Sequence, residues 1–314
     1  MRKATRASTS PEMSGQKGSR QVISIHGVTK RYSRRTALDT IDLELRGPGV
    51  ISFLGPNGAG KTTLFKLINR LSFSDAGEII VNGYNVVSEA EKALFCMGSQ
   101  IDETRFHPYL TGREILSFVY LMRGIPRDMV EERLRTVGEG MGITSFLDDR
   151  LGTYSSGMKQ RFAIANAIMA NTDIIFFDEP TTNLDPSGIA EFRNLIQDLR
   201  EMGKLILISS HLLSEVSGIS DRILIMNRGK IVFDSDFEEI ERFLSVRLEE
   251  IPDNVPKNIP GVSEISRRGD SIVVKPEKGV SNSEVIERFI EKGFKIREIT
   301  EVEGLERIYA SRTA

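Results

Sequence analysis

Hydrophobic residues in the first 240 positions fall into short runs and alternating segments. Residues 22–25 and 41–45 alternate between apolar and polar side chains, which predicts strands with one exposed face. Residues 174–177 and 205–208 are continuously apolar, which is typical of strands that are buried on both faces of a sheet.

Between these strands, apolar residues recur at helical spacing. Pro126 and Asp128 are typical of a helix start, and Gly203 is typical of a helix end. Strands that alternate with helices predict an α/β fold, in which helices cover both faces of a parallel sheet. The predicted helices comprise residues 112–122, 127–137, 157–170 and 187–202.

The pattern changes near residue 245, where we place a domain boundary. Prolines at positions 252, 256 and 260 interrupt the chain, and a strand, a helix, a strand and a short helix follow. We expect a main domain over residues 21–244 and a small α+β domain over residues 245–314. The predicted elements of the small domain are residues 271–274, 283–292, 295–299 and 303–309.

Residues 1–20 contain five basic residues against the single acidic residue Glu12, together with Ser, Thr and Gly. A segment of this composition has too few apolar side chains to form a core, so we expect a disordered basic tail.

The composition is that of an ordinary soluble globular protein, with 39% hydrophobic and 27% charged residues and a net charge of -2. This near-neutral balance gives no reason to expect a nucleic-acid partner. The single cysteine, Cys96, cannot form a disulfide within the chain, which favours a reducing compartment. Every apolar run is shorter than the roughly 18 residues that cross a bilayer, so we expect any membrane-spanning part to belong to another chain.

One loop has a specific chemical pattern, G-x-x-x-x-G-K-[ST], which binds nucleotide phosphates. An apolar run precedes it and a helical pattern follows it, which is the strand–loop–helix context that this site needs. Backbone N–H groups and the helix dipole favour an anion there, and glycines allow its close approach. We expect Lys61 to contact the β- and γ-phosphates and Thr62 to hold Mg²⁺. The predicted phosphate-binding residues are Gly55, Pro56, Asn57, Gly58, Ala59, Gly60, Lys61, Thr62 and Thr63.

Two carboxylates follow the apolar strand at residues 174–177. In a parallel sheet they lie at the carboxyl edge, where ligands bind. We expect Asp178 to hold Mg²⁺ through water, and Glu179 to accept the proton of the water that attacks the γ-phosphate.

The segment Tyr154-Ser155-Ser156-Gly157-Met158-Lys159 resembles the signature sequence of the ATP-binding cassette (ABC) ATPases. It departs from their commonest form, Leu-Ser-Gly-Gly-Gln, because Ser156 replaces the first Gly and Met158 replaces Gln. This variant is similar to the branch whose membrane partners are ABC-2-type exporters.

Further segments are similar to motifs of the same family. Gln100 resembles the Q-loop glutamine, which contacts Mg²⁺ or the attacking water, and Asp185 closes a segment that resembles the D-loop. His211 resembles the switch histidine that contacts the γ-phosphate, and Tyr32 resembles the aromatic residue that stacks on adenine. The resemblance covers residues 22–240.

The resemblance implies a P-loop NTPase with a helical subdomain at about residues 101–165, which carries a docking groove for a membrane subunit. Two interpretations of residues 106–110 stay open: they line that groove, or they form a loop that packs on its own helices. It implies ATP and Mg²⁺ as cofactors, and two cassettes paired head to tail so that Ser155 and Gly157 close on the partner's nucleotide. It also implies transmembrane permease subunits, a second ATP-binding subunit of the same kind, and a cytoplasmic location on the inner face of the cell membrane.

An alternative stays open, namely a soluble ABC ATPase that acts in translation or on DNA. Translation-associated members usually have two cassettes in one chain, and chromosome-associated members have long coiled coils, neither of which this sequence shows. A P-loop kinase or GTPase would leave the signature-like segment and His211 without a role.

Overall fold

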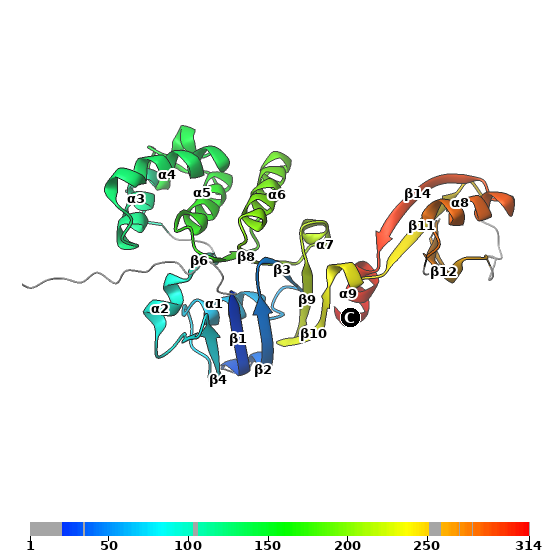
Figure 1. Cartoon of the computed structure of the whole chain (residues 1–314), viewed down its shortest axis with the longest axis horizontal. Helices are drawn as coiled ribbons and strands as arrows, with labels where there is room; N and C mark the ends of the chain where they lie inside the picture. Colours follow the sequence, from blue (N-terminus) through cyan, green and yellow to red (C-terminus); the bar gives the residue numbers. More distant parts are fainter. Residues whose placement is uncertain are drawn as a thin grey trace, which may run out of the picture.

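A computed structural model describes residues 21–33, 35–102, 106–250, 259–269, 271–277 and 279–313 and divides them among three sheets with surrounding helices (Figure 1). The basic tail predicted at residues 1–20, and the prolines at 252 and 256, lie outside these described residues.

The central sheet has six strands in the order β10-β9-β3-β8-β7-β6. All neighbouring strands run parallel except β10, which pairs antiparallel with β9 at one edge. Every residue of β3, β7 and β8 is buried, which explains the continuous apolar runs in the sequence. The predicted parallel sheet is therefore confirmed. Its strands are β3 (Gly49–Leu54), β6 (Met97–Gln100), β7 (Ile174–Asp178), β8 (Leu205–Ser210), β9 (Arg222–Asn227) and β10 (Lys230–Asp236).

Different structures cover the two faces of the central sheet. On one face, α5 (Ser156–Met169) and α6 (Pro186–Glu201) pack against alternate residues of β3, β7 and β8, and α3 (Gly112–Met122) and α4 (Arg127–Gly140) extend this apolar cluster. On the other face, α1 (Lys61–Ile68) packs together with a second, antiparallel sheet.

The second sheet has the order β2-β1-β4-β5. The strands predicted at residues 22–25 and 41–45 lie within β1 and β2 of this sheet, and not in the central one. On this face a helix and a sheet together form the cover, because Phe65 of α1 packs against Phe53 of β3 and Phe176 of β7 while the second sheet joins the same apolar cluster. The remaining elements here are β1 (Val22–Tyr32), β2 (Arg35–Arg46), β4 (Ala76–Val81), β5 (Tyr84–Asn85) and α2 (Ala90–Phe95). α7 (Leu213–Val216) belongs to a different apolar cluster, together with Leu54, Ile223 and Ile225.

The third sheet is antiparallel, has the order β12-β13-β11-β14, and encloses a separate apolar core with α8 (Asn282–Glu291). The boundary predicted at residue 245 falls inside β11, so this sheet begins earlier than expected. β12 lies in a segment for which we predicted no element, and α9 (Leu305–Thr313) packs on the central sheet. The strands are β11 (Arg242–Leu248), β12 (Val262–Arg268), β13 (Ser271–Pro276) and β14 (Ile296–Glu303).

Within the described ranges, none of the helices combines the length and the apolar character that crossing a bilayer requires.

Candidate functional site

The phosphate-binding loop connects β3 to α1 at the carboxyl edge of the central sheet. Its glycines are required by close packing: a Cβ atom on Gly55 would lie 2.3 Å from the carbonyl oxygen of Met226. Gly60, at φ +113°, would place a Cβ atom 2.7 Å from the carbonyl oxygen of Ala37. Gly60 also caps α1 without a side-chain hydrogen bond, so the first N–H groups of the helix stay available for an anion.

This loop forms one wall of a cavity of about 250 Å³. The cavity brings together the side chain predicted to stack on adenine, most of the phosphate loop and the predicted general base. Its lining residues are Tyr32, Arg35, Ala37, Asn57, Gly58, Ala59, Gly60, Lys61, Thr62, Thr63 and Glu179.

Lys61 is buried at the base of this loop, with 5% of its surface exposed. Its Nζ atom donates a hydrogen bond to the carbonyl oxygen of Gly55 at 2.7 Å and lies 3.4 Å from Oε1 of Glu179. A buried ammonium group needs a charge partner, and here the predicted base provides it.

Asp178 ends β7 and is almost fully buried. Its Oδ1 atom accepts hydrogen bonds from the Thr62 hydroxyl, at 3.1 Å, and from the Ser209 hydroxyl. Gln100 ends β6 and donates from Nε2 to the carbonyl oxygen of Asp178 at 3.1 Å. Its Oε1 atom is buried and has no hydrogen-bond partner among the residues that the structure describes. The three residues predicted to bind metal therefore lie together.

Glu179 follows Asp178 in a left-handed backbone conformation, with φ +49°. Its N–H group donates to the hydroxyl of Ser209 at 3.0 Å, which fixes this turn. Its carboxylate lies between Lys61 and His211, whose Nδ1 atom is 2.7 Å from Oε2. The carboxylate is partly exposed to solvent and can therefore reach a water molecule at the cavity.

Tyr32 lies at the mouth of the cavity and is about half exposed, at 48%. Its hydroxyl lies 3.4 Å from the Ser72 hydroxyl, and the Lys30 ammonium group is 5.1 Å from the centre of its ring. An exposed aromatic ring at this position is available for stacking on a base.

Ser155, Gly157 and Asp185 do not line this cavity. Ser155 is exposed at the N-terminus of α5, where its hydroxyl accepts from the Met158 N–H group at 3.2 Å. Asp185 caps α6 by accepting from the Gly188 N–H group at 3.0 Å, and it lies 3.4 Å from Arg161. The structure thus divides the predicted nucleotide-binding residues into two separate groups.

Sequence reasoning missed Arg35, which lines the cavity beside the phosphate loop. Its Nη2 atom donates to the carbonyl oxygen of Gly58 at 2.5 Å. In the sequence it is one of several arginines near Tyr32, so no local signal distinguishes it. Ser209, which orients both Asp178 and Glu179, was also missed, because a serine at a strand end is unremarkable.

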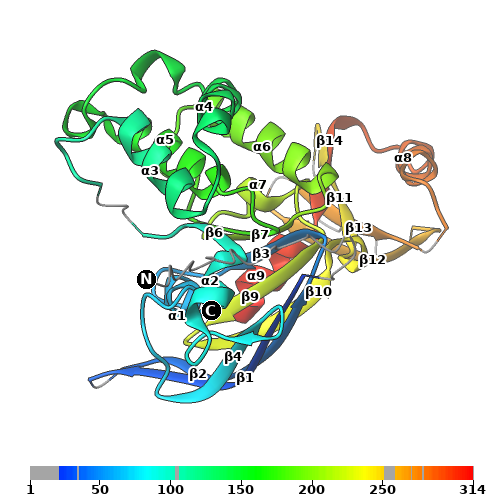
Figure 2. The same ribbon diagram turned by 60° about the vertical axis from the view of Figure 1, so that its left-hand side comes forward.

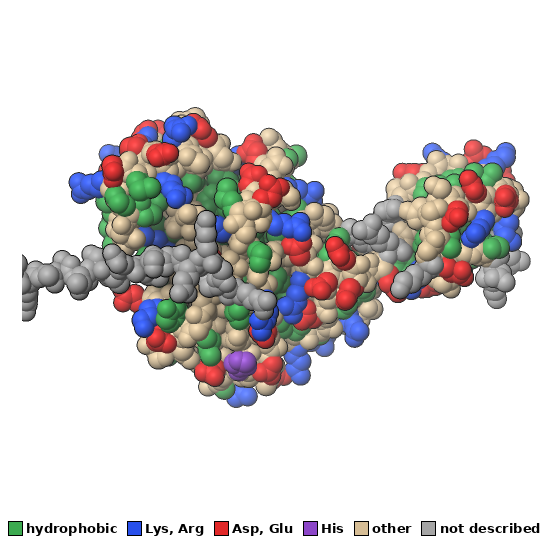
Figure 3. Space-filling model, in the orientation of Figure 1, with side chains coloured by type: hydrophobic (Ala, Val, Ile, Leu, Met, Phe, Trp, Pro, Cys, Tyr) green, Lys and Arg blue, Asp and Glu red, His purple; other side chains and the backbone are tan. Residues whose placement is uncertain are grey.

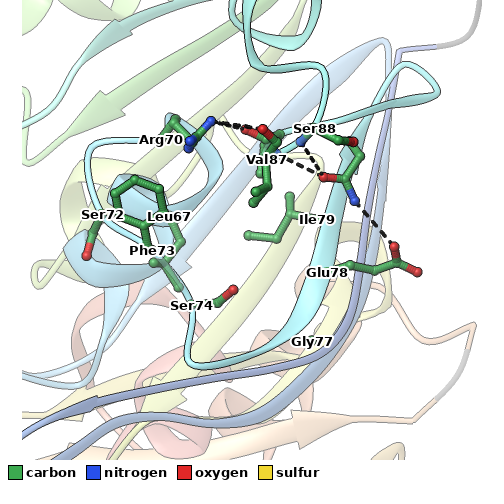
Figure 4. A pocket seen from close by; sticks show the side chains of 12 residues that line it. Leu67, Arg70, Ser72, Phe73, Ser74, Gly77, Glu78, Ile79, Val87 and Ser88 are labelled. Atoms are coloured by element: carbon green, nitrogen blue, oxygen red, sulfur yellow. Dashed lines mark hydrogen bonds between the residues drawn. The ribbon is translucent and has the colours of Figure 1, made fainter.

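A second cavity, of about 320 Å³, lies between the end of α1, β4 and the segment after β5 (Figure 4). Arg70 donates to the carbonyl oxygens of Val86 and Val87, both at 3.1 Å, and its guanidinium group lies 4.7 Å from the centre of the Phe73 ring. None of the predicted site residues lines this second cavity.

Acidic and basic side chains are interspersed over the face of the molecule seen in Figure 3. This distribution agrees with the near-neutral net charge of -2.

The chain matches the ABC transporter family over residues 38–182, a stretch that includes the phosphate loop, the signature-like segment and both carboxylates. It is 38% identical over 211 residues to the ABC transporter ATP-binding protein YdbJ of Bacillus subtilis, covering 67% of this chain and 68% of the relative. It is 36% identical over 223 residues to the bacitracin transport ATP-binding protein BcrA of Enterococcus faecalis, covering 70% and 71%.

Among solved structures, the fold is similar to the dimeric structure of MJ0796, a bacterial ABC transporter cassette. The TM-score is 0.64 at 23% sequence identity, and the alignment covers 68% of this chain and 98% of that one. ABC ATP-binding subunits dimerise and work with transmembrane permeases. The motif residues around the cavity and the extended similarity lead to one conclusion: this chain belongs to the ABC transporter family, as a subunit that binds and hydrolyses ATP.

Proposed function

We propose that this chain is the ATPase subunit of an ABC-2-type exporter, and that two copies close around two ATP molecules to drive a separate permease. The observation behind this proposal is the division of the site. Lys61 and Glu179 line the cavity, whereas Ser155 is exposed outside it. A site that contains all the predicted groups therefore needs a second copy of the chain.

The cavity is suited to the triphosphate of ATP. Lys61 contacts the β- and γ-phosphates after it leaves the carbonyl oxygen of Gly55, and the N-terminus of α1 contributes N–H groups. Tyr32 stacks on the adenine from the mouth of the cavity.

Thr62, Asp178 and Gln100 fit a Mg²⁺ ion. They offer two oxygens that lie 3.1 Å apart and a buried amide oxygen, Oε1 of Gln100, with no partner among the described residues. Mg²⁺ prefers oxygen ligands and is often held by one or two protein groups together with substrate phosphates. When bound, the ion neutralises the charge that develops on the phosphate oxygens.

Glu179 is the general base in this proposal. Its carboxylate accepts a proton from the attacking water, and His211 holds it in place through the 2.7 Å contact. The ammonium group of the buried Lys61 lies on the other side of this carboxylate, 3.4 Å from Oε1.

The helix tip at Ser155 is the partner's half of the site. The hydroxyl of Ser155 and the free N–H groups at the start of α5 form an anion-binding site that is exposed to solvent. In a symmetric pair, each copy offers this tip to the other's γ-phosphate. In a homodimer, each chain therefore supplies the phosphate loop of one site and the Ser155 helix tip of the other.

We place the permease on the surface formed by α2 and α3, where apolar side chains are exposed. Arg123 joins the two helices by donating to the carbonyl oxygens of Phe95, at 3.0 Å, and Met97, at 2.7 Å. Exposed apolar side chains grouped in this way are typical of protein interfaces. The exposed residues are Phe95, Phe118, Leu121 and Met122.

Only some of the residues predicted to line a groove at 106–110 are available to contact the permease. Phe106 packs edge-on against Phe162, with ring centroids 4.8 Å apart, and belongs to the core of the helical subdomain. Tyr109 and Leu110 are exposed and remain available to a permease on the cytoplasmic side of the membrane.

Export is supported by the similarity to BcrA, a bacitracin transport protein, and by the Met158 variant of the signature. Cell fractionation tests the membrane role: the chain should sediment with membranes and should co-purify with an apolar protein from detergent extracts. Recovery of the chain only in the soluble fraction, without such a partner, contradicts it.

The catalytic proposal is tested by Glu179→Gln. We expect ATP to bind as in the wild type, hydrolysis to fall by about 10²–10⁴-fold, and an ATP-dependent dimer to accumulate on size-exclusion chromatography. Glu91→Gln, an exposed carboxylate on α2, is the matched control and should behave like the wild type. Normal turnover by Glu179→Gln excludes Glu179 as the base.

A further inference from the structure

The chain leaves and re-enters the ATPase part of the molecule at one place. β11 and β14 pair antiparallel from Arg242↔Glu303 to Leu248↔Ile296. The Gly304 N–H group donates to the carbonyl oxygen of Glu241 at 2.7 Å, which closes the base of this two-stranded arm. Figure 1 shows that the arm holds the third sheet away from the central sheet and that α9 follows directly at its base.

α9 packs on the ATPase part with one apolar face. Leu305 is buried, and Ile308 and Tyr309 are partly buried against a cluster that includes Leu54, Val216 and Ile225. At the far end of α9, Asn227 Nδ2 donates to the carbonyl oxygen of Arg312 at 2.9 Å. Figure 2 shows α9 beside β9, where these contacts lie.

These contacts adjoin the catalytic residues. Leu54 immediately precedes Gly55 of the phosphate loop, and Val216 belongs to α7, which begins just after His211. Tyr309 packs against the same cluster as Leu213 and Val216 of α7, and its partial burial, followed by the charge of Glu179, raises the pKa of its hydroxyl.

The opposite side of α9 contacts the third sheet. Arg307 Nη2 lies 2.6 Å from Oε1 of Glu264 on β12, and its guanidinium group lies 4.6 Å from the centre of the Phe243 ring on β11. α9 therefore contacts both parts of the molecule, and a movement of the third sheet displaces it through the arm and through Arg307.

We propose that α9 connects the C-terminal sheet to ATP hydrolysis, with Tyr309 as a positioning residue that packs beside α7 and so holds His211 against Glu179. This inference rests on the proposed roles of those two residues. Its consequence is regulation: a ligand or partner that moves the third sheet changes the rate of hydrolysis without touching the nucleotide.

The first test compares Tyr309→Ala with Tyr309→Phe in the full chain. Because small displacements of catalytic groups cost large factors in rate, we expect Tyr309→Ala to lower kcat by about tenfold while ATP affinity, measured by calorimetry, changes less than about twofold. Tyr309→Phe keeps the ring and should retain wild-type kcat. Ala310→Gln, on the exposed side of α9, is the matched control. An unchanged kcat in Tyr309→Ala, or an equal loss in Tyr309→Phe, overturns the proposal.

Hydrogen exchange gives a readout that does not depend on turnover. In Tyr309→Ala, amides of residues 211–217 should exchange faster, while those of α4, remote from α9, should be unchanged. Unaltered exchange at residues 211–217 also contradicts the proposal.

Charge reversal provides a second route if Tyr309→Ala does not fold. Arg307 and Glu264 are both about half exposed, so substitution there has little effect on stability. Arg307→Glu should lower kcat by about threefold, and adding Glu264→Arg should restore it, because the ion pair is re-formed. If neither variant changes kcat, the third sheet does not act through α9.

Glu179→Gln separates failure of the proposed base from failure of this inference. A fully active Glu179→Gln refutes the proposed base. An inactive Glu179→Gln, together with α9 variants that leave kcat unchanged, refutes only this inference.

Discussion

The Nδ1 atom of His211 lies 2.7 Å from Oε2 of Glu179, although 32 positions separate the two residues in the chain. The contact follows from sheet register. β7 and β8 are adjacent parallel strands in which Asp178 is level with Ser209, so the residues just beyond each strand meet at the carboxyl edge. Ser209 then holds the Glu179 turn by accepting from its N–H group.

We predict that His211→Ala lowers kcat for ATP hydrolysis by about 10²-fold, because the base loses the group that orients it. ATP affinity should be nearly unchanged, since Lys61 and the phosphate loop are intact. Steady-state hydrolysis and calorimetry measure the two quantities. His26→Ala, an exposed histidine on β1, is the control, and an equal effect of both substitutions would refute the assignment.

Arg35 should contribute to nucleotide affinity. It is a cation at the cavity wall, and within the described part of the chain its one hydrogen bond goes to the neutral carbonyl of Gly58. We expect Arg35→Met to weaken ATP and ADP binding by about tenfold, because a charge-assisted hydrogen bond contributes roughly 1.5–3 kcal/mol. Adenosine, which has no phosphate, should bind equally to both proteins.

Arg31→Met is the control for Arg35, because Arg31 is exposed on β1 and does not line the cavity. If Arg35→Met binds ATP normally but fails to dimerise, Arg35 contacts the partner subunit and not the nucleotide.

Much of the central sheet was predictable because buried parallel strands leave continuous apolar runs. Residues 174–177 and 205–208 lie within β7 and β8, and the predicted helix at residues 112–122 has the bounds of α3. The helix is sharply defined because Thr111 accepts from the Glu114 N–H group, which fixes its first turn.

Pairing partners were not predictable from the same pattern. The alternation at residues 22–25 is equally compatible with either sheet, and only the antiparallel pairing of β1 with β2 decides it. Likewise the return of α9 to the central sheet depends on Leu305, Ile308 and Tyr309, whose apolar face is too short to indicate what it packs against.

The side chains that meet at the carboxyl edge of the central sheet were predictable where a motif fixes their spacing, as for Lys61 with Thr62 and for Asp178 with Glu179. Arg35 was not, because its position depends on the start of β2 beside the phosphate loop and not on any local pattern.

Tyr120 should make stability fall at high pH. Burial raises the pKa of Tyr120 to about 12, from 10.0. Because the unfolded chain loses this proton first, stability is complete below about pH 10 and declines as the pH rises toward about 12, by up to about 1.4 kcal/mol per pH unit. Urea unfolding at pH 8 and pH 11 measures the decline.

Tyr120→Phe isolates this effect. The Tyr120 hydroxyl has no hydrogen-bond partner among the described residues, so its removal should raise stability at pH 8 by about 1 kcal/mol. The variant should also lose less stability between the two pH values than the wild type does. Tyr109→Phe, at an exposed tyrosine, is the control and should change neither the stability at pH 8 nor its decline between pH 8 and pH 11. An identical decline in Tyr120→Phe and in the wild type would contradict the prediction.

Ser155 should act on the nucleotide of the partner subunit. Because it is exposed and does not line its own cavity, Ser155→Arg should leave ATP binding by the single chain unchanged while dimer formation and hydrolysis are lost. Thr153→Arg, exposed two positions earlier, is the control.

A mixing experiment tests the head-to-tail pairing directly. Lys61→Ala, unlike Ser155→Arg, should abolish ATP binding. When the two inactive chains are mixed in equal amounts, only the mixed dimer has an intact site, formed by Lys61 of the Ser155→Arg chain and Ser155 of the Lys61→Ala chain. Part of the ATPase activity should therefore return, at most about a quarter of the wild-type value, which is the limit for random pairing. Loss of ATP binding in Ser155→Arg alone would show that the serine acts within its own chain, and the head-to-tail pairing would then have no support.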